Sequence, residues 1–463
     1  MALFAIELND AAITVAGPEG VVTSVPGYAA VVDNRAIFGL EAWQQSRLHP
    51  RSVVNRFWRD FSDEPLSHPL GSFHSSADLA HAQLETLLAA LPARPGEVLF
   101  VVPPSWETAQ LGLLLGLADE LALPVRGLVD SAVAATRCEY PHHGLLHLDA
   151  SLHAVTRTRL SQDGCVSLGD RQDIQSLGVT ELERVCVTFI ASRFLQTTRF
   201  DPLHDARSEQ YLYDNLREWL SQLHRQGEIG LTVPYGGNEF RAGIRRDELA
   251  ACVADAFESV VRQLRGSVGA NDSLAVQVTS RLAQFPGVID SLAALPQATV
   301  FELEPGAAAA GALQRAEQFV PGTAGVGLTS ALSWDRPAAD MSGAGRTPVN
   351  AHSRLEPTHL LHDGLVYRLS SGIFHIGAEL APGETGLNLG PALSGVSRRH
   401  CSIQRGANGV ELVDHSRFGT RLNGHAIDTT VILQTGDVIG IGSPLLQLRL
   451  VREVDVGSDT DGT

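Results

Sequence analysis

The chain has 463 residues, of which 44% are hydrophobic, and its formal charge is −17. This length suffices for two or three domains, and the negative charge argues against a general nucleic-acid or anionic-membrane binder, because such binding needs clustered positive charge. The sequence contains no lysine, so all 35 basic residues are arginine. A Walker-type phosphate lysine, Schiff-base chemistry and every other mechanism that needs an ε-amine are therefore excluded.

The five cysteines are an odd number, lie far apart and show neither disulfide nor metal-ligand spacing. This predicts reduced, mostly buried thiols and no metal site. The first residues lack the charged region of a signal peptide, and no apolar run reaches the length of a membrane span. We therefore expect a cytoplasmic protein that does not bind membranes.

Strands and helices alternate along residues 1–318, which predicts an α/β body of two similar lobes. The expected strands are residues 3–8, 12–16, 21–32, 97–102, 125–128, 145–148, 154–160, 229–233 and 273–278. The expected helices are residues 108–121, 132–137, 179–193, 208–225, 288–295 and 305–316, with a further amphipathic helix that ends at residue 264.

The composition changes after the body. Residues 319–356 are rich in Gly, Ala, Ser and Pro with little apolar periodicity, which predicts a flexible linker. Residues 357–453 carry short strands separated by Gly-containing turns, the pattern of an all-β sandwich. Residues 454–463 form an acidic tail.

Two stretches of the predicted sandwich concentrate side chains suited to gripping a phosphorylated peptide, namely Ser397-Arg398-Arg399-His400 and residues 414–424. Together with Leu433-x-x-Gly436-Asp437-x-Ile439, their order and spacing resemble forkhead-associated (FHA) domains over residues 357–453. That family binds phosphothreonine peptides through loops at one end of a β-sandwich. The resemblance implies phosphopeptide-binding roles for Ser397, Arg398, Arg417, Thr420 and Asn423, and structural roles for Gly377, His400, Gly419 and Gly424.

Within this resemblance, Ser397 would hydrogen-bond the phosphate, Thr420 would sit at the phosphate rim and Asn423 would hold the peptide backbone. One departure concerns the arginine that normally follows the glycine of the third strand, because Ala378 stands in its place. Loss of a charge-assisted contact should weaken phosphate binding by orders of magnitude unless another arginine replaces it. The arginines available by sequence are Arg398, Arg399, Arg417 and Arg421, and the alternative interpretation is that they are ordinary solvated surface residues.

The order of the body segments resembles the actin-like ATPase fold, specifically the nucleotide-binding domain of seventy-kilodalton heat-shock chaperones. The resemblance rests on residues 6–12 at the first phosphate hairpin, Val101-Val102-Pro103 at a strand end, residues 128–135 as the connecting segment, residues 146–151 as the second phosphate loop and residues 306–311 as the final Ala-Gly-rich helix. It implies a site for ATP or ADP with Mg²⁺.

Departures from this pattern predict a pseudo-ATPase. Glycines that would let backbone N–H groups approach a phosphate are absent, and their places hold Asn9, Ala11, Ser151 and Leu152. The first-hairpin aspartate is Glu7, Asp149 keeps its expected identity, residues 277–281 lack the adenosine-loop glycines, and the catalytic lysine cannot exist. We expect no cofactor, although residual nucleotide or metal binding through Glu7 and Asp149 stays open. Alternatively, these carboxylates are ordinary turn and strand-end residues.

The leading hypothesis is a bacterial cytoplasmic adaptor that presents its FHA module to a threonine-phosphorylated or acidic protein partner. The second is a divergent ATPase whose nucleotide state signals to that module. The third is a chaperone-like or filament-like assembly protein. The identity of the partner and the oligomeric state stay open at this point.

Overall fold

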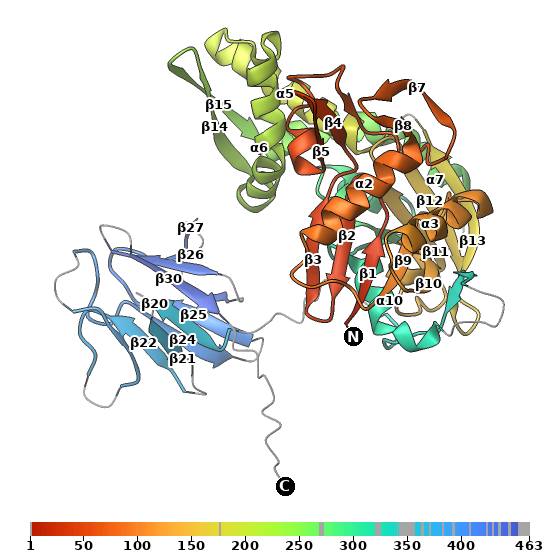
Figure 1. The fold of residues 1–463 in the computed structure, drawn as a ribbon. Coiled ribbons are helices and arrows are strands. Elements are labelled where there is room, and N and C mark those ends of the chain that lie inside the picture. The colour runs from red at the N-terminus through yellow and green to blue at the C-terminus, as the bar shows by residue number, and fades with distance from the viewer. Residues whose placement is uncertain are drawn as a thin grey trace. The chain divides into compact units, whose positions relative to one another are not determined.

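The computed structural model describes residues 2–175, 177–267, 273–319, 326–339, 341, 357–362, 365–369, 372–381, 384–390, 394–406, 409–422, 425–427, 430–433, 437–442 and 446–451. The chain divides into two compact units, Met1–Val349 and Asn350–Thr463, and each is described by itself. Helices and strands mix in the first unit, whereas strands make up the second (Figure 1). No helix of the described chain combines the length and apolar character needed to cross a membrane.

The first sheet of the body has the strand order β18-β10-β9-β1-β2-β3 within the described residues. Strands β1, β2 and β3 form an antiparallel meander, β9 pairs parallel with β1, and β10 pairs parallel with β9. Parallel strands at the centre of a sheet are covered on both faces, which explains the unbroken apolar runs of β9 and β1. The bounds are β1 Leu3–Glu7, β2 Ile13–Gly17, β3 Gly20–Val25, β9 Glu97–Val102, β10 Val125–Asp130 and β18 Leu328–Thr329.

The second sheet repeats this arrangement, with the order β17-β16-β11-β12-β13-β19. Again three strands form an antiparallel meander, and the first of them, β11, pairs parallel with β16, which in turn pairs parallel with β17. The bounds are β11 Gly144–Ala150, β12 Val155–Ser161, β13 Val166–Ile174, β16 Leu274–Val278, β17 Ala298–Glu302 and β19 Ala331–Leu332. The body therefore contains two sheets of like strand arrangement, and each sheet with the helices packed on it is called a lobe below.

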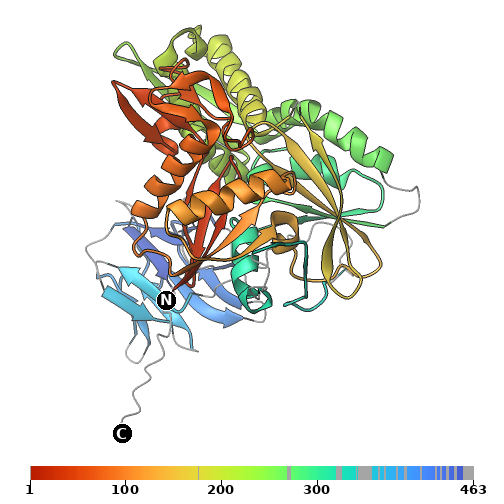
Figure 2. The same ribbon diagram turned by 45° about the vertical axis from the view of Figure 1, so that its right-hand side comes forward.

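Alternate residues of the first sheet face two different layers. Phe4 and Ile6 of β1 pack with α2 and α3, while Ala5 and Leu99 pack against a layer of small residues from α4 and α10. Helices α2 and α3 lie together on one face of this sheet (Figures 1 and 2). These helices are α2 Ser76–Ala89, α3 Thr108–Glu120, α4 Ser131–Ala135 and α10 Ala307–Gln314.

Helices α4 and α10 form the layer that the two sheets share. A Cβ on Gly311 would lie 1.9 Å from the carbonyl oxygen of Ala134, so the two helices approach as closely as they do because this residue is glycine. Arg315 follows α10 and donates hydrogen bonds to the carbonyl oxygens of Thr136 at 2.9 Å and Val133 at 3.3 Å, which satisfies the end of α4. This layer fixes the lobes against each other.

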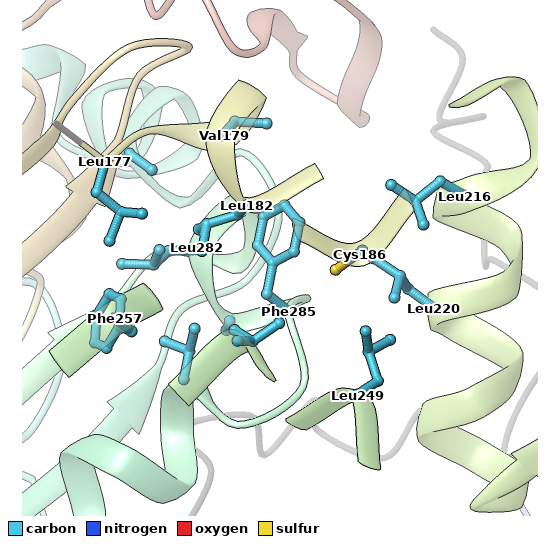
Figure 3. Close-up of a cluster of buried hydrophobic side chains, with 14 of the residues drawn as sticks. Leu177, Val179, Leu182, Cys186, Leu216, Leu220, Leu249, Phe257, Leu282 and Phe285 are labelled. Atoms are coloured by element: carbon cyan, nitrogen blue, oxygen red, sulfur yellow. The ribbon is translucent and has the colours of Figure 1, made fainter. Parts of the chain in front are cut away.

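A large apolar cluster fills the second lobe beyond its sheet. It gathers Leu182 and Cys186 of α5, Leu216 and Leu220 of α6, and Leu249 of α7 (Figure 3). The helices of this lobe are α5 Val179–Thr198, α6 Ala206–Gln226, α7 Arg246–Ser267, α8 Ser280–Ala283 and α9 Val288–Ala293, with a 3₁₀ turn Pro202–His204. The apolar faces of α6 and α7 are buried in this cluster, and this burial, rather than helix propensity, stabilises the two helices.

Smaller elements complete the body. They are β4 Ala29–Val32, β5 Arg35–Phe38, α1 Leu40–Trp43, β6 Val53–Val54, β7 Pro65–Leu70, β8 Phe73–Ser75, β14 Glu228–Tyr235, β15 Asn238–Arg245 and a 3₁₀ turn Ala316–Gln318. Cys138 and Cys186 are buried here and Cys401 is buried in the second unit, while Cys165 and Cys252 are half-buried, and all five are free thiols.

The expected linker 319–356 requires a correction. Residues 328–329 form β18, which extends the first sheet beside β10, and residues 331–332 form β19, which pairs with β13 of the second sheet. Trp334 and Met341 pack against the shared layer. These strands are only two residues long and show no periodicity, so the composition alone indicated a linker. Residues 342–356 and the acidic tail 454–463 lie outside the described residues.

The second unit is a β-sandwich, as expected. One sheet has the order β21-β20-β30-β29-β26-β27 and the other the order β23-β22-β24-β25-β28, around a core that includes Leu360, Ile376, Leu412 and Leu448. The bounds are β20 His359–His362, β21 Leu365–Arg368, β22 Phe374–Gly377, β23 Gly386–Asn388, β24 Cys401–Gly406, β25 Gly409–Asp414, β26 Arg421–Leu422, β27 His425–Ala426, β28 Thr430–Ile432, β29 Val438–Ile441 and β30 Leu446–Val451.

Candidate functional site

Ser397 lies where three loops of the sandwich meet. Its carbonyl oxygen accepts a hydrogen bond from the Ala378 N–H at 3.0 Å, just after β22. Its hydroxyl accepts one from the Arg417 N–H at 3.3 Å, in the segment between β25 and β26. The hydroxyl of Ser397, the place of the missing arginine and the backbone of Arg417 are thus brought together by folding.

His400 supports this loop from inside the sandwich. It is fully buried, and its Nδ1 accepts a hydrogen bond from the Ser397 N–H at 3.1 Å. Burial lowers the pKa of His400, so the ring is neutral near pH 7 and can act as an acceptor. A side chain at Gly377 would place its Cβ 1.9 Å from the carbonyl oxygen of Arg398, so the adjoining turn needs glycine.

The structure corrects the role expected for Thr420. This residue is 0% exposed, and its hydroxyl donates to Oδ1 of Asp414 at 2.7 Å, so it cannot lie at a phosphate rim. Asp414 also accepts from the Ser416 N–H at 2.9 Å. Burial raises the pKa of Asp414, but hydrogen bonds from Thr420 and Ser416 outweigh this, and its net pKa is lowered. Asp414 therefore holds the 414–420 loop as a charged acceptor, a role that the sequence analysis did not assign.

Two of the candidate arginines lie near carboxylates. Arg398 is 87% exposed and its Nε lies 3.9 Å from Oε2 of Glu379, while Arg399 forms an ion pair with Glu384. Arg417 is exposed and, among the described residues, its side chain forms no ion pair. The backbone N–H of Arg417 contacts the Ser397 hydroxyl, so Arg417 is a candidate for binding an anion beside that hydroxyl.

Two further residues complete the picture of these loops. Gly419 has φ +83°, a left-handed conformation that glycine adopts without strain. Phe418, beside it, is 73% exposed, and its sequence pattern did not suggest a role for it. Asn423 and Gly424 lie outside the described residues.

In the body, Arg281 occupies the space between the two carboxylates singled out by sequence. Its Nε lies 3.1 Å from Oδ1 of Asp149, and its Nη2 is hydrogen-bonded to Glu7. Burial raises the pKa of Glu7. Burial lowers the pKa of Arg281, but the charges of Asp149 and Glu7 outweigh this and raise it overall. The guanidinium therefore stands where a cation bound by these carboxylates would have to lie.

The two hairpins expected to hold phosphate are bonded to each other instead. Nδ2 of Asn9 donates to Oδ2 of Asp149 at 3.0 Å, and the Leu152 N–H donates to Oδ1 of Asp10 at 2.7 Å. Asp149 also accepts from the Thr279 hydroxyl at 2.7 Å. The Leu152 N–H, a backbone donor that an anion could use, is consequently engaged by a carboxylate.

These residues do not fit a nucleotide with Mg²⁺. The cavity lined by Glu7, Asp149 and Arg281 has a volume of about 10 Å³. A second cavity, lined by Asn9, Asp149 and Ser151 among others, has about 230 Å³, and both are smaller than the roughly 300–1,000 Å³ of small-molecule sites. In the described part of the chain, no three His, Cys, Asp or Glu side chains are grouped so as to hold a metal ion. Glu7 and Asp149 thus act on Arg281 and on the neighbouring hairpin.

Comparison with known proteins identifies one part of the chain. The family model for the FHA domain matches residues 387–442, a range that includes Ser397, His400 and the 414–420 loop. No curated protein matches the chain. The second unit therefore contains an FHA domain, a module of the phosphopeptide-binding class.

Proposed function

We propose that this protein is a non-catalytic adaptor whose FHA domain binds a protein partner that carries phosphothreonine or an equivalent acidic group. The observation that carries the proposal is the meeting of the Ser397 hydroxyl with the Arg417 backbone at 3.3 Å, beside an arginine side chain without a carboxylate partner in the described residues. A hydroxyl donor and an arginine side chain on residues in contact with each other are groups that bind a phosphate. Exposure of Arg417 and Phe418 leaves this point open to a peptide.

The adaptor role leaves the body to be accounted for. We propose that it is a derivative of the actin-like ATPase fold, because its two lobes repeat one strand order. The 10 Å³ cavity, the hydrogen bonds between the hairpins and the position of Arg281 argue for a pseudo-ATPase. Its role would then be to present the FHA domain or to bind further partners.

A matched peptide titration tests the proposal. The full chain is titrated with a degenerate peptide library centred on phosphothreonine and with the same library centred on threonine. Binding of the phosphorylated library alone supports the proposal, and equal affinity for the two libraries contradicts it. A site built for phosphate should bind an aspartate-centred library more weakly, because a carboxylate lacks the charge and the three acceptor oxygens of a phosphate. If the aspartate-centred library binds as tightly as the phosphothreonine library, the site is assigned to acidic partners.

A further inference from the structure

A cavity of about 230 Å³ lies in the body beside the bonded hairpins, apart from the FHA domain. Asp10 of the β1–β2 turn lines it, as do Trp58 and Trp106. Asp60 and Asp173 add carboxylates to its wall, and Arg59 adds one cation. The wall is therefore both acidic and aromatic, the reverse of what a phosphate needs.

Asp10 carries a carboxylate oxygen without a hydrogen bond. The residue is 5% exposed, and its Oδ1 accepts from the Leu152 N–H at 2.7 Å. Its Oδ2 is buried and has no hydrogen-bond partner among the described residues. Leaving a buried polar atom unpaired is costly, so a donor that enters the cavity and reaches Oδ2 would be bound favourably.

The aromatic wall is rigid. Trp58 and Trp106 stack with ring centroids 6.3 Å apart at 14°, and Phe61 stacks on Trp106 at 5.1 Å. Nε1 of Trp58 donates to Gln83 at 2.7 Å, which fixes the ring. A Cβ on Gly27 would lie 2.9 Å from Trp58 and 3.1 Å from the Asp10 backbone, so this glycine lets the indole and the carboxylate residue lie close together.

We propose that this cavity binds a small organic cation, a guanidinium or alkylammonium group, that donates to Oδ2 of Asp10 beside the Trp58 and Trp106 rings. Carboxylates compensate the charge of such a group, and aromatic faces stabilise it by cation–π attraction. Of these groups, guanidinium suits the cavity best, because its planar shape can stack on an aromatic ring while its in-plane N–H groups donate to a carboxylate. It could come from a free small molecule or from an arginine side chain of a protein partner. The proposal is independent of the FHA function.

Calorimetric titration of the full chain with n-butylguanidinium, and with its neutral isostere n-butylurea, tests this directly. We expect n-butylguanidinium to bind with a Kd of about 1 mM or below and n-butylurea to bind about tenfold more weakly. Equal affinities, or no heat up to about 10 mM of either probe, would overturn the proposal. A blocked Gly-Arg-Gly peptide distinguishes the two sources. Peptide binding about tenfold tighter than that of the free probe supports a partner's arginine, and similar binding supports a small molecule.

Variants locate the site. Asp10→Asn removes the charge but keeps an acceptor for the Leu152 N–H, and it should weaken n-butylguanidinium binding about tenfold. Asp163→Asn, in the exposed β12–β13 turn, is the matched control and should leave binding unchanged. Asp173→Asn should weaken binding about threefold, and it serves as the test if Asp10→Asn does not fold. Unchanged binding in both Asp10→Asn and Asp173→Asn would overturn the assignment.

Discussion

Nε of Arg281 lies 3.1 Å from Oδ1 of Asp149, and the same guanidinium is hydrogen-bonded to Glu7. Arg281 lies in α8, just after β16, whereas Asp149 lies in β11 and Glu7 ends β1. This contact therefore joins elements of both lobes. A buried cation thereby replaces, at the centre of the body, the ligand expected from the resemblance to ATPases.

Arg281→Ala should destabilise the body by about 3–5 kcal/mol, because it leaves two buried carboxylates without their partner. Urea denaturation of the full chain, followed by tryptophan fluorescence, measures the change in the free energy of unfolding. The control is Arg245→Ala, whose ion pair with Asp247 has side chains 57% and 65% exposed and should contribute less than about 1 kcal/mol. Similar small losses for both variants would show that the buried pair does not hold the lobes.

ATP with Mg²⁺ should not change the melting temperature of the full chain, and no phosphate should be released. A ligand that binds the folded state raises its stability by RT ln(1 + [L]/Kd), so a nucleotide at about 1 mM would reveal even a Kd of about 0.1 mM. The cavity of about 10 Å³ beside Arg281 is too small for a nucleotide, and the cavity of about 230 Å³ beside Asp10 is walled by carboxylates that would repel its phosphates. A clear thermal shift together with phosphate release would favour the divergent-ATPase hypothesis instead.

Features that depend on residues close together in the sequence could be predicted, whereas features that depend on distant residues could not. The FHA loops could be predicted because Ser397, His400 and the 414–424 motif are local and chemically distinctive. The burial of Thr420 could not be predicted, because the motif does not show that the Thr420 hydroxyl turns inward to donate to Asp414. Such a contact depends on how the loop folds back on itself.

Long-range features were less accessible. Arg281 is separated from Glu7 by 274 residues, and nothing in either segment indicates that the guanidinium enters the site. The loss of phosphate-loop glycines predicts that ordinary ATP chemistry is absent, and this stays a prediction. It did not indicate the hydrogen bond between Asn9 and Asp149. Strands β18 and β19 escaped prediction because pairing with β10 and β13, rather than their own sequence, makes them strands.

Asp130→Asn should stabilise the body increasingly as the pH rises. Burial raises the pKa of Asp130 from 3.8 to about 6, so the folded state binds its proton more tightly than the unfolded state. The stability that this proton gives to the folded state is complete below pH 3.8 and is lost as the pH rises through about 6. Asparagine carries no charge and retains the acceptor for the Ala132 N–H at 2.9 Å.

The free energy of unfolding of Asp130→Asn, relative to wild type, should therefore increase by about 2–3 kcal/mol between about pH 4 and about pH 7. Chemical denaturation at a series of pH values measures it. A difference that is constant over this range, or that decreases, would contradict the raised pKa.

Ala378→Arg should increase phosphothreonine-peptide affinity about tenfold or more, because it restores a charge-assisted contact next to Ser397. The Ala378 N–H already donates to the Ser397 carbonyl at 3.0 Å, and this backbone bond does not depend on the side chain. Ala378→Gln is the control for side-chain length without charge. If both substitutions have the same effect on the Kd, charge is not what the site lacks.

The most direct test of the adaptor hypothesis is the phosphate-dependent binding of the full chain before and after changing Ser397 and Arg417. Fluorescence anisotropy with one phosphothreonine peptide and its threonine counterpart gives both affinities. We predict at least about tenfold preference for the phosphorylated peptide, lost in Ser397→Ala and in Arg417→Ala but kept in Arg368→Ala, an exposed arginine on β21. Equal affinity of the wild-type chain for the two peptides, or a preference that survives both substitutions, would contradict the account.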